Sequence, residues 1–383
     1  MSAAQDFNVA INGKFLSANP TGVHRVAEEL IRALQTIIQE RGMPPFTAEV
    51  ICPSDIRRSF EDGLIPMRKG GVFTWQFWEQ FDLPFLARKR LLVSLCNLAP
   101  ITVSDAITMI HDAQVYLTPE SYSPAFRSWY QFILPVIGRR HRRILTVSEY
   151  SREQLALHNV APKEKITVIH NGVDHMNKVG VDPSIIDRLG LEKRNYICAL
   201  ANTQRHKNIS VLLKAFSENE LASCKLVLFG AADRNAFAQE LGVEAPANVV
   251  FAGFVTDEEM RSLMEMSLGF ACPSTTEGFG LPPLESMLLG APAIVAPEGA
   301  LPEVCGEAAV YADAFDPSAW SGAIARLRAD EAYWSELSQS GKARAAQFTW
   351  RKSAEKLLAA INAELLDMNS AEQPITASKQ MSA

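Results

Sequence analysis

Residues 268–290 read LGFACPSTTEGFGLPPLESMLLG, and this stretch decides the fold class of the chain. It begins with a short apolar run, continues as a glycine-containing loop, and ends in an apolar segment with Pro282 and Pro283 near its start. Proline suits the first turn of a helix, because its missing N–H has no helical partner there. The stretch therefore predicts a buried strand, a tight loop and a helix, which is the repeating unit of an α/β sheet.

The same unit repeats along the whole chain. Segments of helical periodicity, such as Val23–Leu34, Ser151–His158, Ile209–Phe216 and Glu258–Met266, lie between short runs rich in β-branched residues. The runs are apolar throughout rather than alternating, as expected for parallel strands covered on both faces. They occupy residues 8–12, 48–52, 91–95, 107–110, 144–147 and 166–169, and then 195–201, 225–230, 248–253, 268–274 and 292–296. We therefore predict two doubly wound, Rossmann-like α/β domains that face each other across a cleft.

The rhythm of strands and helices pauses at residues 175–194, which carry Gly, Pro and charged residues. A boundary there predicts an amino-terminal domain over residues 1–178 and a carboxy-terminal domain over residues 179–348. We expect a helix over residues 349–367 that crosses back to the first domain. Residues 368–383 are polar and lack periodicity, so we expect a disordered tail.

Length and charge narrow the possible functions. A chain of 383 residues is longer than one hydrophobic core typically accommodates, and its length suits two domains. The net charge of −6 argues against a general nucleic-acid binder. Residues 1–175 carry 19 Lys/Arg against 17 Asp/Glu, whereas the remainder carries 18 against 26. The first half is therefore the better candidate to meet an anionic surface or acceptor.

Cysteine usage and hydropathy bear on the cellular location. The six cysteines include no C-x-x-C pair and no zinc spacing, and most lie inside apolar runs, which indicates reduced, buried thiols. The amino terminus has no signal-peptide pattern, and no apolar stretch reaches the roughly 20 residues that a membrane helix needs. We expect a cytoplasmic protein, bound at most to the inner face of the cell membrane.

Two glutamates flank the glycine loop, with seven residues between Glu277 and Glu285. The loop glycines allow close backbone approach to a ligand, and the helix N-terminus offers N–H groups to a diphosphate. We expect Glu285, in the first helical turn, to accept from ribose hydroxyls, and Glu277 to accept from hydroxyls of a sugar. The alternative is that Glu277 caps the loop and Glu285 stabilises the helix N-terminus.

A pair of cations lies in the segment Ala201–Phe216, which reads ANTQRHKNISVLLKAF. A strand ends near Ala201 and a helix begins after Asn208, so Arg205 and Lys207 lie at the carboxyl edge of a strand. Two cations there can hold a diphosphate and offset the charge that develops on it as the sugar leaves. The alternative is a solvated basic turn.

Three further segments place polar groups at strand ends. His111 and Asp112 follow the run at residues 107–110; a lone His is more often structural, and Asp112 is expected to fix either the ring or the loop. The stretch ANPTGVHR, residues 18–25, forms a turn whose amides can approach a phosphate. The stretch FAGFVTDEEM, residues 251–260, places backbone groups at a sheet edge, although an ordinary turn explains it equally well.

Taken together, these segments resemble the family-four retaining glycosyltransferases, which have the GT-B fold. The resemblance lies in an E-x7-E motif at Glu277 and Glu285, a phosphate turn ending in Lys-Asn, an "HD…PE" segment and a T-G-V-x-R stretch, and it covers nearly the whole chain. It implies that Glu277 contacts the transferred sugar and that Glu285 binds the ribose. Many members have another Arg, or a Gly, several residues before the Lys, where this chain has Ala201 and Asn202, so Lys207 matches the family pattern better than Arg205 does.

The resemblance also implies roles for the other residues. It places His111 at the donor sugar, Lys207 at the diphosphate and Gly22 at a donor phosphate. It implies acceptor contacts from His24 and Arg25. It implies donor contacts from the backbone of Phe279, Gly280 and Leu281, and base contacts from Gly253, Phe254 and Val255.

The sequence favours a transferase without a metal or other cofactor. No D-x-D motif occurs, so cations and helix ends are expected to hold the diphosphate. A retaining glycosidase needs two carboxylates about 5 Å apart and has no need of Lys207. A GT-B-fold sugar-nucleotide epimerase and a non-enzymatic scaffold remain as alternatives. We predict transfer of a hexose to a saccharide or lipid-linked saccharide, in the assembly of a surface polysaccharide of the lipopolysaccharide type. The first candidate donor is GDP-mannose, which supplies mannose, and the alternative is a UDP-sugar.

A basic cluster suggests contact with a membrane. It comprises Arg139, Arg140, Arg142 and Arg143, and the aromatic residues at 122, 126, 129, 130 and 132 precede it. An amphipathic helix with a cationic end can bind an anionic leaflet. The alternative is that the arginines form a solvated face or pair with acidic residues of the protein.

Overall fold

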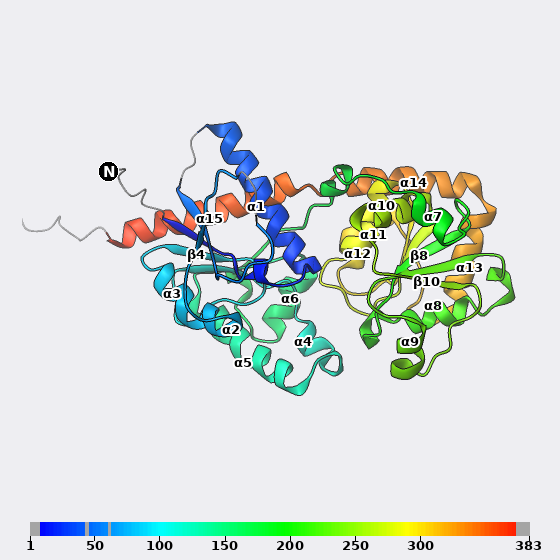
Figure 1. Ribbon diagram of the computed structural model, residues 1–383, viewed down its shortest axis with the longest axis horizontal. Helices are drawn as coiled ribbons and strands as arrows, with labels where there is room; N and C mark the ends of the chain where they lie inside the picture. The colour runs from blue at the N-terminus through cyan, green and yellow to red at the C-terminus, as the bar shows by residue number, and fades with distance from the viewer. Residues whose placement is uncertain (1–7, 43–45, 60–62, 373–383) are drawn as a thin grey trace, which may run out of the picture.

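The computed structural model describes residues 8–42, 46–59 and 63–372, and it has two α/β halves (Figure 1). The first half contains a seven-stranded sheet of order β3-β2-β1-β4-β5-β6-β7, and the second a six-stranded sheet of order β10-β9-β8-β11-β12-β13. All strand pairs are parallel. In each sheet the strand order reverses beside the first strand, as in doubly wound folds. The predicted fold class is confirmed.

Each of the predicted apolar runs overlaps a strand. The strands are β1 (Val9–Asn12), β2 (Ala48–Cys52), β3 (Met67–Lys69), β4 (Leu91–Ser94), β5 (Ala106–Met109), β6 (Arg143–Thr146), β7 (Ile166–Val168), β8 (Tyr196–Leu200), β9 (Lys225–Phe229), β10 (Val249–Gly253), β11 (Gly269–Cys272), β12 (Ala293–Val295) and β13 (Val310–Tyr311). The sequence missed β3 and β13. Both are sheet edges with partly exposed residues, so they lack the apolar signal of covered strands.

The helices lie between the strands in chain order. They are α1 (Gly22–Arg41), α2 (Trp75–Phe77), α3 (Leu83–Leu86), α4 (Gln114–Leu117), α5 (Pro124–Arg140), α6 (Glu149–Leu157), α7 (Ser184–Arg188), α8 (Ile209–Ala215), α9 (Arg234–Leu241), α10 (Asp257–Met266), α11 (Leu281–Leu289), α12 (Leu301–Cys305), α13 (Pro317–Ala329), α14 (Glu331–Ala345) and α15 (Trp350–Glu372). Across the described ranges, every helix is too short or too polar to span a bilayer.

Helix α15 carries the chain from the second half back to the first, where it packs on α1 (Figure 1). Its Leu357 and Ile361 are buried in the same hydrophobic cluster as the inner face of α1. Arg351 of α15 donates to Glu40 of α1 at 2.7 Å. The helix therefore fastens the two halves to each other through apolar burial.

The prediction of a disordered tail over residues 368–383 is wrong for residues 368–372, because α15 continues to residue 372. Leu365 and Met368 still pack against the hydrophobic cluster, and this contact extends the helix. The rest of the predicted tail, residues 373–383, lies outside the described residues.

Truncating the buried face of α15 tests this packing. Leu357 is 1% exposed, so Leu357→Ala should lower the free energy of unfolding by about 2–5 kcal/mol, because a cavity replaces buried methyl groups. Leu366 lies on the same helix but is 68% exposed, so Leu366→Ala is the matched control. Denaturant unfolding followed by circular dichroism measures both. Equal stabilities of the two variants would contradict the packing.

Candidate active site

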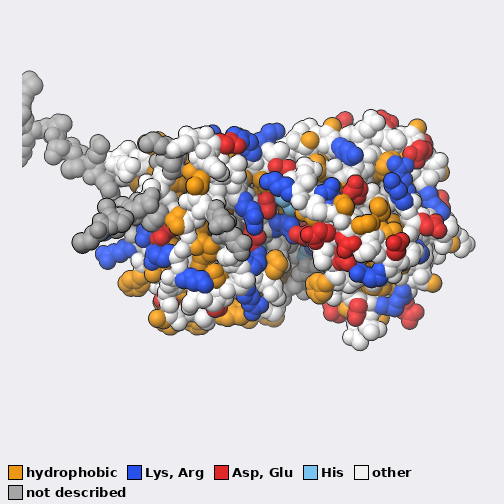
Figure 2. Space-filling model, turned by 45° about the horizontal axis from the view of Figure 1, so that its top comes forward, with side chains coloured by type: hydrophobic (Ala, Val, Ile, Leu, Met, Phe, Trp, Pro, Cys, Tyr) orange, Lys and Arg blue, Asp and Glu red, His pale blue; other side chains and the backbone are white. Residues whose placement is uncertain are grey.

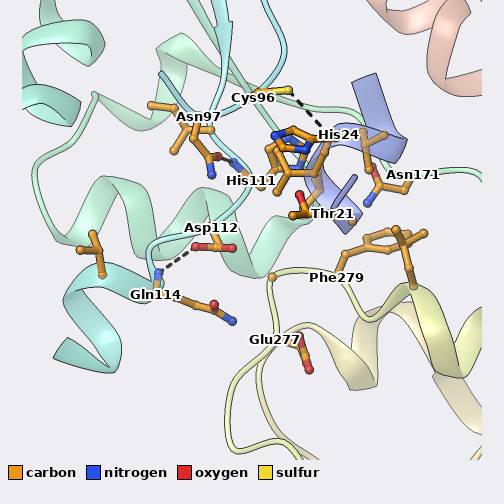
Figure 3. Close-up of a pocket in the computed structure, with 18 of the residues that line it drawn as sticks. Thr21, His24, Cys96, Asn97, His111, Asp112, Gln114, Asn171, Glu277 and Phe279 are labelled. Atoms are coloured by element: carbon orange, nitrogen blue, oxygen red, sulfur yellow. Dashed lines mark hydrogen bonds between the residues drawn. The ribbon is translucent and has the colours of Figure 1, made fainter. Parts of the chain in front are cut away.

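The two halves enclose a cavity of about 630 Å³. Its walls come from segments that follow strands at their carboxyl ends, where open α/β sheets bind ligands. Figure 3 shows Thr21, His24 and His111 of the first half on one side, and Glu277 and Phe279 of the second half on the other. The predicted cleft between two facing domains is present, and it brings most of the predicted site residues together.

Two helix N-termini form part of the cavity wall. Helix α1 begins at Gly22 and helix α11 at Leu281, and both residues line the cavity. Gly280 precedes α11 with a φ of +92°, a conformation that side chains disfavour and glycine allows. The first N–H groups of a helix lack helical acceptors, and the helix dipole favours negative charge there. The arrangement suits an anion such as a diphosphate.

Gly278 brings the glycine loop into close contact with the first half. A Cβ at this position would lie 2.8 Å from Cβ of Asp112 and 3.1 Å from the carbonyl oxygen of His111, so a side chain does not fit. The carbonyl oxygen of Gly278 accepts from Oγ of Ser148 at 2.7 Å and from Oγ of Ser151 at 3.1 Å. These contacts fix the position of the neighbouring Glu277 relative to His111.

Glu277 and Lys207 form a mostly buried ion pair at the cavity. Nζ of Lys207 donates to Oε1 of Glu277 at 2.8 Å and to Oε2 at 3.0 Å, and Oγ of Ser274 donates to Oε1 at 2.7 Å. Burial alone raises the pKa of Glu277, but Lys207 and the hydrogen bonds outweigh it, so the pKa is lowered. Burial likewise opposes the charge of Lys207, yet the carboxylate raises its pKa. Both groups are charged at neutral pH, and the ammonium has one N–H left for a ligand.

His111 is held as a neutral ring. Burial, which the carbonyl of Leu95 only partly offsets, lowers its pKa to about 4. Its Nε2 lies 2.9 Å from that carbonyl oxygen and therefore carries the proton, and its backbone N–H donates to Oδ1 of Asn97 at 2.8 Å. The tautomer leaves Nδ1 as a hydrogen-bond acceptor. The ring can therefore accept from a sugar hydroxyl without gaining charge.

Asp112 fixes the loop rather than the ring of His111. Its Oδ1 accepts from the backbone N–H of Gln114 at 3.0 Å, at the start of α4, as Figure 3 shows. Burial raises the pKa of this carboxyl group. Of the two functions expected for Asp112, the structure supports the second.

The prediction that Glu285 lies in the first helical turn is wrong. Helix α11 begins at Leu281, before the two prolines, so Glu285 lies in the second turn, and it does not line the cavity. Its side chain is buried, with Oε1 3.2 Å from Nε2 of His175. Nδ1 of that histidine accepts from Nε1 of Trp350 at 3.1 Å. Glu285 is thus linked to the segments that connect the two halves.

Two predicted cations lie outside the cavity wall. Arg205 is exposed, whereas Gln204 and Lys207 line the cavity. The segment is a 3₁₀ turn, in which only residues three positions apart lie on the same side. Arg205 and Lys207 are two positions apart, so they lie on different sides of the turn. Arg25 donates from Nη2 to both carboxylate oxygens of Asp257, at 2.7 and 2.9 Å, across the two halves. Of the two predicted acceptor residues, His24 alone lines the cavity.

The predicted base-contacting segment also lies outside this cavity. Gly253 ends β10 with a φ of +69°, and the side chain of Phe254 is 83% exposed. Val255 packs partly buried against the hydrophobic cluster. The segment precedes α10, whose first residue is Asp257, so it lies beside the ion pair with Arg25.

Glu303, which was not among the residues predicted from the sequence, joins the halves at another point. Its carboxylate accepts from the backbone N–H groups of Glu149 and Tyr150, at 2.9 and 3.1 Å, where α6 begins, and lies 2.8 Å from Nε2 of His170. Burial raises the pKa of Glu303, but these donors outweigh it and lower the pKa. No local pattern marks such a residue, because its partners lie more than a hundred positions away.

Aromatic rings of α5 and the turn before it form another wall of the cavity. Tyr122 and Phe126 stack with ring centroids 5.3 Å apart, and Phe126 and Tyr130 stack at 4.2 Å. This wall belongs to the first half, opposite the ion pair of Lys207 and Glu277. It supplies flat apolar surface next to the polar donors of the two helix N-termini.

The basic cluster at the end of α5 is largely neutralised. Arg142 donates to Asp105 at 2.8 Å and to Asp367 at 2.7 Å, and Arg143 donates to Glu364 at 2.7 Å. The prediction that all four arginines face a membrane is wrong for these two, because each pairs with an acidic residue that α15 brings from the end of the chain. Arg139 and Arg140 are exposed.

The fold and the site together define a class. Two parallel α/β sheets on either side of a cavity, with helix N-termini in its wall, are the GT-B arrangement. Within the described ranges, no group of three His, Cys, Asp or Glu residues could hold a metal ion.

Residues 20–176 match the model described as Glycosyltransferase Family 4, and residues 182–346 match that described as Glycosyl transferases group 1. The chain belongs to the family-four glycosyltransferases, and it is therefore a retaining enzyme of a metal-independent family.

Comparison with known proteins agrees with this assignment. The chain is 27% identical to the O-antigen chain mannosyltransferase RfbU of Salmonella typhimurium, over 62% of this chain and 65% of the relative. It is 29% identical to the O-antigen chain mannosyltransferase B of Escherichia coli, over 66% and 68%. The chain thus matches about two thirds of the length of these relatives. The structure of Anabaena Alr3699/HepE in complex with UDP and glucose superimposes with a TM-score of 0.66 at 18% identity, covering 96% of this chain and all of that chain.

Removing the ammonium group at the cavity tests the assignment of Lys207. Lys207→Ala should lower kcat at least about tenfold if Lys207 stabilises the leaving diphosphate, as the sequence predicts. Lys214→Ala, on the exposed side of the following helix α8, is the matched control and should retain full activity. Steady-state transfer assays measure both variants, and thermal unfolding checks the fold. A near-normal kcat for Lys207→Ala would show that the cation has no part in the reaction.

Proposed function

We propose that the enzyme transfers mannose from GDP-mannose, with retention of configuration, to a lipid-linked saccharide in the assembly of a surface polysaccharide. The observation that carries the proposal is the cavity in which Lys207 and two helix N-termini meet opposite His111. The choice of mannose is supported by the two O-antigen mannosyltransferases to which the chain is similar.

The proposed donor site divides into an anionic part and a sugar part. The diphosphate would bind between Gly22 at the start of α1, Leu281 at the start of α11, and the remaining N–H of Lys207. The sugar would lie between Glu277 and His111, both of which offer acceptors to its hydroxyls. Because the loop at Gly278 fixes these two residues relative to each other, the sugar would be oriented without large rearrangement.

The proposed reaction needs no protein nucleophile. The bond between the anomeric carbon and the diphosphate oxygen breaks, while Lys207 and the helix ends stabilise the departing charge. The acceptor hydroxyl forms the new bond on the same face of the sugar, and its proton passes to the leaving phosphate oxygen. His111 stays neutral throughout, because its pKa of about 4 lies well below physiological pH.

The nucleoside would extend from the diphosphate towards Glu285 and residues 253–255, which is the region now bridged by Arg25 and Asp257. Glu285 contributes to the electrostatic environment of Arg25, so the two groups are neighbours. We infer that this ion pair separates when the donor enters and that Glu285 then reaches the ribose. A UDP-sugar is the second candidate donor, favoured by the UDP complex of the similar Anabaena protein.

A membrane surface is the proposed location of the acceptor. The segment 72–85 exposes Phe73, Trp75, Phe77, Phe81 and Phe85, and α5 adds further exposed aromatics. Figure 2 shows hydrophobic side chains gathered along the lower edge of the first half. A cluster of so many exposed aromatic side chains is unusual for a surface that contacts only water, and it is typical of an interaction site. The exposed cations Arg88, Lys89, Arg139 and Arg140 lie in the same half and are complementary to anionic lipid.

A donor and acceptor screen tests the proposed transfer. Octyl glycosides of mannose, glucose and galactose are incubated with GDP-mannose, UDP-glucose or UDP-galactose, in EDTA, and products are examined by NMR. We expect mannosyl transfer with the α-configuration of the donor, and no loss of rate in EDTA. Absence of transfer from any donor, inversion, or epimerisation of the donor without an acceptor would each contradict the proposal.

Vesicle flotation tests the membrane surface. The triple variant Trp75→Ser, Phe77→Ser, Phe85→Ser should lose binding to phosphatidylglycerol vesicles at low salt, because its apolar anchors are removed. Wild-type binding should weaken as salt screens the cations. Phe315→Ser, an equally exposed phenylalanine of the second half, is the control and should bind as wild type does. Equal flotation of wild type and triple variant, or association of the wild-type chain with itself through this surface, would overturn the proposal.

A further inference from the structure

A second cavity of about 150 Å³ lies beside the main one, and His24, for which the sequence predicted an acceptor contact, is the one predicted site residue that lines it. His24, Cys96 and Tyr130 line both cavities, so the two are neighbours with shared walls. A volume of this size exceeds the roughly 30 Å³ share of one water about fivefold, which leaves room for a small ring. The cavity lies at the carboxyl ends of β1 and β4, the edge of the first sheet at which ligands bind.

A buried carboxylate, Glu79, forms the polar end of this cavity. Its side chain is 3% exposed. Oε1 accepts from Nδ2 of Asn12 at 2.8 Å, and Oε2 accepts from Nζ of Lys14 at 2.7 Å. An ionised carboxylate has about four acceptor positions, and these bonds use two of them. The carboxylate therefore keeps acceptor positions that the hydroxyls of a ligand in this cavity can use.

The backbone around Glu79 is irregular at this point. Residues 78–82 form a π-helical turn, and Trp75 just before it has a φ of +56°. Such π-turns are frequent at functional sites, and a positive φ at a bulky residue persists only where the surroundings enforce it. The turn directs Glu79 inward to the second cavity, while Phe77 and Phe81 on the same segment remain exposed.

The remaining lining has the chemistry of a sugar site. Nζ of Lys14 also donates to Oε1 of Gln76 at 2.8 Å, so a carboxylate, an ammonium and two amides line one side. The rings of Phe15 and Tyr130 line the cavity as well. Polar groups of this kind bind hydroxyls, while aromatic rings pack on the apolar faces of a pyranose.

The position of the cavity relative to His111 gives its role in the reaction. Nε2 of His111 bonds to the carbonyl of Leu95, and Leu95 lines the second cavity. The second cavity therefore adjoins the end of the main cavity at which the donor sugar is proposed to lie. The exposed aromatic residues of segment 72–85 also adjoin it through Gln76 and Glu79, so a membrane-borne glycan would reach it directly.

We propose that this second cavity binds the terminal sugar of the saccharide acceptor, with Glu79 accepting hydrogen bonds from its hydroxyls. The inference rests on the proposed glycosyl transfer and adds the site at which the acceptor binds. Lys14 and Asn12 hold the carboxylate in place, and Gln76 completes the polar wall.

Acceptor kinetics test this subsite with the octyl glycoside and donor identified by the screen above. Glu79→Gln keeps the shape of the side chain but removes its charge, and Gln76→Ala removes a partner at an exposed position. Both should raise the KM for the octyl glycoside, Glu79→Gln at least tenfold, while the KM for the donor and the rate of donor hydrolysis stay within twofold of wild type. Gln80→Ala is the matched control. It lies on the same π-turn, bonds to the backbone of Ala99 and Ile101, and does not line the cavity, so its acceptor KM should not change.

The outcomes separate this inference from the proposed function. If wild type transfers sugar but Glu79→Gln and Gln76→Ala keep the wild-type acceptor KM, the subsite is refuted while the transferase assignment stands. A loss in Glu79→Gln that affects donor hydrolysis and thermal stability equally, with Gln76→Ala unchanged, would show a structural role for Glu79 and also refute the subsite. If wild type transfers no sugar from any donor, the proposed function itself fails.

Discussion

The close docking of the glycine loop at Gly278 onto the first half is the constraint on which the rest of the site depends. Because a Cβ there would meet Asp112 and the carbonyl of His111, only glycine lets the loop approach so closely. The hydroxyls of Ser148 and Ser151 then satisfy the carbonyl of Gly278. This contact places the start of α11 opposite the start of α1, and the cavity between them is a consequence.

Electrostatics within the cavity follow from that geometry. Lys207 and Glu277 neutralise each other in a buried pair, and two helix dipoles add positive potential without any side-chain charge. A cavity built in this way suits an anionic ligand while Glu277 itself remains charged. The interface holds other charges in the same manner: Glu303 meets the N-terminus of α6, and Arg25 meets Asp257. The halves are thus joined by polar contacts that can separate, whereas α15 joins them by apolar burial.

Much of the fold was predictable because its signals are local. Parallel strands that are covered on both faces, such as β8 and β9, are apolar throughout. This signal lies within the strand itself and can be read without knowing its neighbours. Edge strands such as β13 have one partner and partial exposure, so the same signal is weak there. Helix α15 extends beyond its predicted end because Met368 contacts a core formed by residues far away in the chain. Polar composition alone therefore predicted disorder where tertiary packing supports a helix.

For the site, the sequence by itself determined which residue types are available and in which loop each lies: Glu277 beside the glycines, Lys207 before α8, and His111 after β5. Only the tertiary structure decided which of them share a cavity. Arg205 is two positions from Lys207, yet it is exposed outside the cavity wall. The two residues lie on different sides of a 3₁₀ turn. Glu79 carries no sequence motif and still lies at a cavity wall. The direction of a side chain, and the partners it meets across more than a hundred residues, depend on packing that no local pattern contains.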